Sequence, residues 1–344
     1  MNSEQQYIDL YLQAQELICR HSSPLMNSRR QEAFEAFRQS GFPGRQAERY
    51  KYTDVAQVFS PDYGLNLSRL DIPVNPYEVF RCDVPNLSTS LYFVLNDQFY
   101  DKALPKVQLP DGVIVSSLNK ASVQHPELLE RCYGRLARSG KDAINALNTM
   151  LAQDGLLVYV PRGVVVDRTI QVVNILRADV DLMVNRRVLV VLEDGAQARI
   201  LVCDHALDDR NFLATQVSEI FVGENAHLEL YELEETHVKC RRMSNMYVQM
   251  QANSTAVLDS ITLQNGLTRN RADVRLDGPG AEVYMNGCVI ADQKQHVDNN
   301  TLIDHAAAHC QSHQLYKYVL DDEAVGAFAG RILVREGAQH TVSK

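Results

Sequence analysis

One strand-and-turn phrase recurs through the second half of the chain, from Arg187 to Lys344. Each copy alternates β-branched or aliphatic residues with polar ones, reaches a short turn rich in Gly, Ala and Asp, and then alternates again. Alternation with a period of two predicts strands rather than helices. Small turn residues recur at spacings of 30, 28, 26, 27 and 31 positions, at Ala196, Ala226, Ser254, Gly280, Ala307 and Ala338. The chain therefore contains a repeat built from strands.

A repeat of this length favours a β-solenoid, because one coil cannot bury its apolar face alone and a stack of coils can. The small residue at each turn fits this interpretation, since successive coils pass one another at strand-pairing distance. An antiparallel sandwich with hairpins of similar spacing is the alternative. We expect the mainly β core to occupy residues 156–344 and to be incomplete at its C-terminal end.

The chain before the repeat divides into two parts. Residues 1–90 are predicted to form a helical region and a linker, with one amphipathic helix from Tyr7 and a second that starts at a capping box of Ser28 and Gln31 and stops at Gly41. Residues 60–90 form the proline-containing linker. Residues 91–155 are predicted to supply strands at 91–99 and 113–115 and a helix at about 142–153 that covers the open end of the stack.

Composition limits the partners and the compartment. The chain has 34 Lys and Arg against 43 Asp and Glu, a net charge of −9, so nucleic acid and membrane surfaces are not expected partners. The N-terminus has no secretion-signal pattern and no run of about twenty apolar residues occurs, which predicts a cytoplasmic protein. The 7 cysteines include no C-x-x-C pair, which is typical of a reducing compartment.

Motifs for nucleotide hydrolysis and for common hydrolases are absent. The sequence contains no G-x-x-x-x-G-K-[ST], no G-x-G-x-x-G that opens a helix, no G-x-S-x-G and no H-E-x-x-H. We therefore expect that this chain hydrolyses no nucleotide and binds no ATP on its own.

Two groups of side chains are candidate metal ligands. The denser group is His305, His309, Cys310 and His313, which needs a bulge or a turn before all four can meet one metal, because neighbouring residues of a strand point to opposite faces. The second is Cys203 with His205, which share one face of a strand. Packing in the core and at turns is the alternative for both groups.

Other charged and aromatic clusters are interpreted structurally. Glu232, Glu234 and Glu235 are expected to be solvated turn charges, because nothing indicates a second carboxylate converging on a substrate. Residues 41–53 are predicted to be a docking loop that packs Tyr50 and Tyr52 on the N-terminal helices.

Four stretches together resemble the SufB and SufD family of iron–sulfur cluster assembly proteins. The segment E-R-Y-K-Y-T near the N-terminus is similar to one found early in SufD proteins, and the lead into the repeat is similar as well. Near the C-terminus, D-H-x-x-x-H-C-Q-S-H-x-x-Y-K and F-A-G-R-I-L-V, followed by A-Q-H-T, resemble a run shared by SufB and SufD. The stretches are residues 48–53, 143–163, 304–317 and 328–341. The early segment, the short lead and the lack of SufB's extra cysteine sequence favour SufD.

This resemblance implies a right-handed parallel β-helix core after a helical region. It also implies a role as a scaffold in a complex with SufB and SufC homologues, in which SufC is the ATPase. No stably bound cofactor is implied for this subunit, and an iron–sulfur cluster is held only transiently at the level of the complex.

The resemblance also sets expectations for the C-terminal end. The family continues with further coils, a C-S-H-G-type segment whose histidine faces SufB, and helices that hold SufC, none of which occurs in these 344 residues. The chain is therefore expected to be C-terminally truncated relative to the family. Exposed strand edges at such an end favour self-association, for instance as a dimer.

Two other kinds of solenoid are the functional alternatives. A carbohydrate-active β-helix enzyme would carry a secretion signal and a groove of Asp, Lys and Arg along one face. A hexapeptide-repeat acyltransferase would show an aliphatic period of six residues. The sequence shows none of these features.

Overall fold

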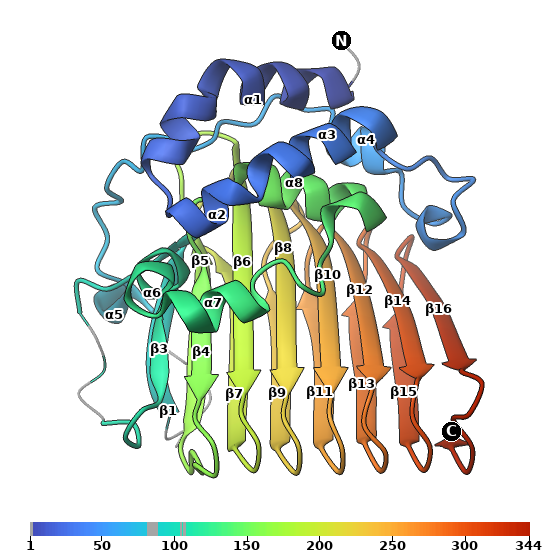
Figure 1. Ribbon diagram of the computed structural model, residues 1–344. Helices are drawn as coiled ribbons and strands as arrows, with labels where there is room; N and C mark the ends of the chain where they lie inside the picture. The colour runs from blue at the N-terminus through green and yellow to red at the C-terminus, as the bar shows by residue number, and fades with distance from the viewer. Residues whose placement is uncertain (1–2, 81–88, 104, 106–107) are drawn as a thin grey trace.

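The computed structural model describes residues 3–80, 89–103, 105 and 108–344. Its N-terminal half contains helices and the first strands, and its C-terminal half is strand (Figure 1). The helices are α1 (Ser3–Arg20), α2 (Pro24–Ser28), α3 (Arg30–Ser40), η1 (Glu48–Tyr50), α4 (Val55–Val58), α5 (Pro76–Val79), α6 (Leu118–Gln124), α7 (Pro126–Cys132), η2 (Ser139–Lys141) and α8 (Ala143–Leu151).

Strands from alternate positions in the chain form two stacked sheets. The even-numbered strands from β4 to β16, together with β3, make an 8-stranded sheet, which we call sheet A. The odd-numbered strands other than β3, together with β2, make a 9-stranded sheet, called sheet B. The strands are β1 (Thr89–Leu95), β2 (Gln98–Phe99), β3 (Ile114–Ser117), β4 (Leu156–Val160), β5 (Thr169–Leu176), β6 (Leu182–Leu192), β7 (Gln197–Ala206), β8 (Phe212–Val222), β9 (His227–Glu235), β10 (Cys240–Met250), β11 (Thr255–Gln264), β12 (Leu267–Leu276), β13 (Glu282–Ala291), β14 (His296–His305), β15 (Gln311–Leu320), β16 (Val325–Val334) and β17 (Val342–Ser343).

The repeat forms a parallel β-solenoid. Each coil contributes one strand to sheet A and the next strand to sheet B, and from β4 onward each strand pairs in parallel with the equivalent strand of the next coil. Two strands that follow each other in the chain therefore lie in different sheets, whereas a hairpin would pair them within one. The prediction of a mainly β solenoid is confirmed, and the antiparallel sandwich was the wrong alternative.

The corners that follow the sheet A strands stack in register. At the equivalent position of six successive corners the residue has a positive φ, which non-glycine residues adopt uncommonly, and these residues are Gly195, Asn225, Asn253, Gly280, His309 and His340. The next residue is a small or apolar one with almost no exposure in five corners, namely Ala196, Ala226, Ser254, Ala281 and Cys310. These five residues are equivalent because strand pairing aligns the residues that directly follow them, which are Gln197, His227, Thr255, Glu282 and Gln311.

This register corrects part of the predicted repeat. Ala196 and Ala226 are equivalent, as the spacing predicted, but Gly280 lies one residue early and Ala281 takes the corresponding place. Likewise Ala307 precedes the equivalent residue, Cys310, by three positions. The corners of the later coils contain more residues than those of the earlier coils. Small residues at these later corners therefore do not all occupy equivalent positions.

The N-terminal helices lie across the outer face of sheet A. In Figure 1, α1 to α4 and α8 lie over one end of the sheet A strands. Buried side chains of α1, α3 and α8 form one apolar cluster with outward residues near the starts of β6, β8 and β10, which are Met183, Leu213 and Met243. Tyr11 of α1 stacks on Phe34 of α3 with ring centres 5.0 Å apart. This layer buries an apolar sheet face that would otherwise be exposed.

Helix α8 does not cover the open end of the stack. Asn145 donates to the hydroxyl of Tyr247 at 2.8 Å, and Asn148 donates to the Arg186 carbonyl and to the Thr215 hydroxyl, each at 3.0 Å. These partners belong to β10, β6 and β8, so α8 lies across the face of sheet A. At the end of the stack, β3 pairs with β4 and β1 pairs with β5. The predicted strands at 91–99 and 113–115 correspond to β1 to β3.

The start of the second helix differs from the prediction. The backbone N–H of Met26 donates to the Ser23 side chain, which caps α2, and Arg29 precedes α3 without a side-chain cap. The hydroxyl of Ser28 instead donates to the Leu25 carbonyl at 2.7 Å. The predicted capping box was therefore wrong, because Pro24 already begins a helix one turn earlier. Gly41 ends α3 with a φ of 59°, as predicted.

The predicted linker at 60–90 falls partly on residues 81–88, which lie outside the described residues. Within 60–80, Gly64 forms a parallel bridge with Leu182, and α5 is a short helix that begins at Pro76. The boundaries at residues 90 and 155 stay a prediction.

Candidate functional site

The solenoid interior is apolar along one side and polar along the other. Toward the corners described above, aliphatic side chains from both sheets fill it, including Leu192, Val222, Leu228 and Met250. Toward the opposite corners, charged and amide side chains face inward from β6, β7, β9, β10 and β12. Buried charges are costly unless they are paired, so this polar side is where the fold departs from simple core packing.

Asp204 and Glu232 are held by two arginines inside the solenoid. Arg186 of β6 lies 2.6 Å from Asp204 of β7, and Arg242 of β10 lies 3.5 Å from Asp204 and 3.1 Å from Glu232 of β9. Burial alone would raise the pKa of Asp204, but the charges of Arg242 and Arg186 hold it below its ordinary value. These ion pairs cross from one sheet to the other and fix the distance between them.

Glu234 lies beside this network of ion pairs, but the pKa of its carboxyl group is shifted in the opposite direction from that of Asp204. Its carboxyl group accepts hydrogen bonds from the Thr268 hydroxyl at 2.7 and 2.8 Å, and the residue is 3% exposed. Burial raises the pKa of Glu234 to about 7, although the nearby charge of Arg242 opposes the shift. Glu234 therefore exchanges its proton near neutral pH, unlike Asp204.

Glu232 and Glu234 were predicted to be exposed turn charges, and this was wrong. Leu228 and Leu230 point into the solenoid, and residues two and four positions further along the same strand must point the same way. The alternation of β9 thus contained the signal that Glu232 and Glu234 face inward. Glu232 is partly buried and Glu234 is buried.

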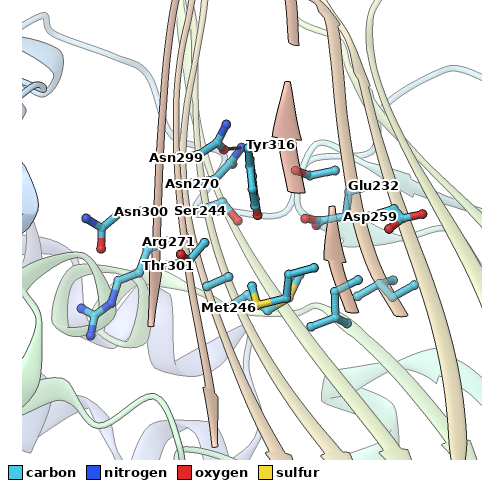
Figure 2. A pocket seen from close by; sticks show the side chains of 15 residues that line it. Glu232, Ser244, Met246, Asp259, Asn270, Arg271, Asn299, Asn300, Thr301 and Tyr316 are labelled. Carbon is cyan, nitrogen blue, oxygen red and sulfur yellow. Dashed lines mark hydrogen bonds between the residues drawn. The ribbon is translucent and has the colours of Figure 1, made fainter. Parts of the chain in front are cut away.

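A small cavity adjoins the network. Figure 2 shows that Asn270, Asn299 and Tyr316 lie together on one side of it, with Glu232 on the other. Its volume of about 30 Å³ is enough for one water molecule. Asn270 donates to Asn299 at 3.0 Å, and burial raises the pKa of the Tyr316 hydroxyl. The cavity can therefore hold one bound water molecule between Glu232 and the two asparagines.

The pH dependence of stability tests the ionisation of Glu234. Near pH 4 its carboxyl is protonated in both states. As the pH rises from about 4.5 to 7 the unfolded chain loses this proton while the folded chain keeps it, so the folded state loses stability over that window. We expect Glu234→Gln, which does not titrate, to gain about 2 to 3 kcal/mol over the wild type between pH 5 and 8. Urea unfolding of both proteins at pH 5 and at pH 8 measures this gain in the free energy of unfolding. An equal pH dependence in the two proteins would contradict the assignment.

The structure separates the four predicted ligands near β15. His305 points into the solenoid, where its Nε2 lies 2.9 Å from the Ser312 hydroxyl, and burial lowers its pKa. Cys310 also points inward and donates to the Gly278 carbonyl at 3.3 Å, and burial raises the pKa of its thiol. Both side chains are part of the core.

The two other histidines of this group lie outside the core. His309 is the corner residue with positive φ, and its ring stacks on His340 of the next corner at 5.0 Å. His313 on β15 stacks on Tyr284 at 4.8 Å. The turn that the sequence required is therefore present, but it directs the four side chains to different places.

Cys203 and His205 share the outer face of β7, as their spacing predicts. Cys203 packs in an apolar cluster with Phe93 and Val173, and the His205 ring lies 5.2 Å from that of Phe80. Across the residues that the structure describes, no three His, Cys, Asp or Glu side chains are grouped to hold a metal ion. The assignment of these residues as ligands stays a prediction.

The segment at 48–53 docks on the solenoid, not only on helices. The Tyr50 hydroxyl donates to Asp142 at 2.6 Å, and the Arg269 guanidinium lies 3.8 Å from the centre of its ring. Neighbouring residues extend this contact, with Arg49 2.9 Å from Asp273 of β12 and a Thr53 hydrogen bond of 2.7 Å to Asp298 of β14. Tyr52, also predicted to pack, is 47% exposed. The segment thus fixes the N-terminal region to sheet A.

None of the helices in the described part of the chain has the length and apolar content that crossing a bilayer requires.

Comparison with known proteins identifies the family. The "SufBD protein N-terminal region" matches residues 1–172, and the "SUF system FeS cluster assembly, SufBD core domain" matches residues 175–344. An iron–sulfur cluster assembly SufBD family protein of Synechocystis is 23% identical over 97% of this chain and 76% of its own length. The assembly protein SufD of Escherichia coli is 24% identical over 44% of this chain and 35% of its own length.

A chloroplastic protein of Arabidopsis thaliana, ABCI7, is 23% identical over 93% of this chain and 67% of its own length. The two family matches together span both the helical region and the solenoid, and they meet near the end of β5. This chain therefore belongs to the SufBD family of the SUF system for iron–sulfur cluster assembly.

Proposed function

We propose that this chain is a SufD-type scaffold subunit that works in a complex with SufB and SufC homologues and performs no catalysis of its own. The observation that carries the proposal is the docking of the E-R-Y-K-Y-T segment, the stretch that most resembles SufD. Its residues Arg49, Tyr50 and Thr53 all make specific contacts to sheet A or to Asp142. The named similarity to SufD of Escherichia coli agrees with this choice.

The form of the molecule supports a scaffold. Two long sheets expose an extended surface, and charge pairs cross the interior and hold the sheets at a fixed separation. A rigid surface of this kind loses little conformational entropy when partners bind. In this proposal the iron–sulfur cluster is cargo that the complex holds transiently, and His305, His309, Cys310, His313, Cys203 and His205 are the candidate contacts within this chain.

Cluster loading tests the proposal. The chain, a complex of the SufB and SufC homologues, and the three proteins together are each supplied anaerobically with ferrous iron and sulfide and then desalted. We expect the three-protein sample to retain several times more iron and acid-labile sulfide than either other sample. A full cluster retained by this chain alone would contradict a scaffold role at the level of the complex.

The self-association predicted above stays a prediction. If the isolated chain forms a dimer, sedimentation velocity will show a boundary whose position depends on concentration. Addition of the SufB homologue is then expected to replace this boundary with that of a mixed complex.

A further inference from the structure

An open groove of about 720 Å³ lies on the outer face of sheet A, beside the segment that joins α7 to α8. Its floor includes the outward side chains Phe221 of β8, Tyr247 of β10 and Leu302 of β14. In Figure 1, α7 and the segment after it lie in front of β4, β6 and β8, whereas the lower parts of β12, β14 and β16 have no helix in front of them. We call this region the basic groove.

The charge of the basic groove is opposite to that of the whole chain. Among the described residues that line it are eight Arg and Lys side chains and three Asp side chains. The chain as a whole carries a net charge of −9. Each of the three carboxylates is already paired with arginine, in the pairs Arg49–Asp273, Arg271–Asp273, Arg275–Asp277 and Arg335–Asp304. The groove therefore has an excess of positive charge that its own carboxylates do not neutralise.

Three of the cations have no carboxylate partner within the described part of the chain. The Arg135 guanidinium donates to the Glu130 carbonyl at 2.9 and 3.1 Å, and neither Arg138 nor Lys141 forms an ion pair there. All three side chains are exposed. They lie along one wall of the groove, within seven residues of the chain. An anionic ligand would therefore form its most favourable new ion pairs at this wall.

The backbone beneath this wall is held by a buried carboxylate. Glu219, whose side chain is 1% exposed, accepts hydrogen bonds from the backbone N–H groups of Gly134, Leu136 and Ala137 at 2.8, 2.7 and 3.1 Å. The same carboxylate is paired with Arg187 at 2.8 Å. The exposed cations thus project from a fixed backbone, which reduces the entropy that binding must offset.

We propose that the basic groove binds an acidic segment of a partner protein. Carboxylates of that segment would pair with Arg135, Arg138 and Lys141, and its apolar side chains would lie on Tyr247 and Leu302. A phosphate ligand fits less well, because the N–H groups that could cradle it are engaged by Glu219. A nucleic acid is disfavoured by the negative charge of the rest of the chain. The inference does not depend on the proposed function.

Binding of a labelled acidic peptide tests this inference. The probe is fluorescein-labelled octaglutamate, measured by fluorescence anisotropy at low ionic strength. We expect the triple variant Arg135→Ala, Arg138→Ala, Lys141→Ala to bind it about tenfold more weakly than the wild type, since three exposed charge pairs are lost. The control is Arg168→Ala, Arg210→Ala, Lys317→Ala, which removes the same charge from exposed positions outside the groove. We expect this control to bind within twofold of the wild type.

Two further measurements distinguish the outcomes. Thermal melts should show both triple variants folded like the wild type, since they change only exposed side chains. Tripolyphosphate and a short DNA duplex are tested as competitors, and tighter binding of either in the groove would overturn the choice of an acidic peptide. Equal losses in the two triple variants, or no binding by the wild type at millimolar peptide, would overturn the groove itself.

Discussion

Glu219→Ala is expected to lower the free energy of unfolding by about 3 to 5 kcal/mol. The change leaves Arg187 buried without its partner, and it removes the acceptor for three backbone N–H groups of the segment after α7. A buried ion whose partner is deleted costs more than the pair contributed, because its desolvation is no longer compensated. Equilibrium unfolding in guanidinium chloride measures the difference.

The matched control for this variant is Glu224→Ala. Glu224 is exposed in the turn after the same strand and forms no side-chain ion pair with a described residue, so its loss is expected to change stability by less than about 0.5 kcal/mol. Replacing both members of the buried pair, as in Arg187→Met with Glu219→Leu, should recover part of the loss. A Glu219→Ala protein as stable as the control would show that the pair does not hold this segment.

Gly278→Ala is expected to destabilise the solenoid by about 3 kcal/mol, near the upper end of the range for overpacking. A Cβ atom at this position would lie 1.9 Å from the backbone nitrogen of Ala252 and 2.4 Å from the carbonyl carbon of Gln251. Both are backbone atoms of the preceding coil, which cannot move aside without disturbing the strand pairing of β10 and β12. Thermal unfolding monitored by circular dichroism measures the effect.

Gly140→Ala provides the comparison. A Cβ atom there has no other atom within 4 Å, so the substitution tests the loss of a glycine without a close coil contact. We expect its stability to lie within about 0.5 kcal/mol of the wild type. If Gly278→Ala were equally harmless, the coils would not pass as closely as described.

The repeat was predictable because alternation and small turn residues are local properties of the sequence. Alternation identifies which side chains face inward, and it predicted a strand repeat from Arg187 to Lys344, where the structure has the strands from β6 onward. The residue at each corner was harder to assign, because corners differ in length and both Gly280 and Ala281 are small. The positive φ shared by Gly195, Gly280 and His309 appears only once the coils are aligned in space.

The polar interior could have been predicted, whereas the contacts between distant segments could not. Glu234 continues the inward alternation of Leu228 and Leu230, so its burial follows from the strand alone. In contrast, Thr53 contacts Asp298 across more than two hundred residues, and no local pattern indicates that pairing.

The candidate ligands show the same limit. Spacing indicated that His305, His309, Cys310 and His313 need a bulge or a turn to converge, but it could not show where each side chain of that turn points. His309 has a φ of 63°, so its side chain does not follow the alternation of the strands on either side of the corner. Stacking on His340 of the next coil then depends on the solenoid as a whole.

The most direct test of the scaffold assignment is the composition of the complex that this chain forms. The chain is co-expressed with the SufB and SufC homologues of its own organism, with the affinity tag on SufC alone, and the purified material is examined by size-exclusion chromatography with light scattering. We predict one peak that contains all three proteins and is lost when the SufB homologue is omitted. Elution of this chain apart from SufB and SufC, as a monomer or a dimer, would contradict the account.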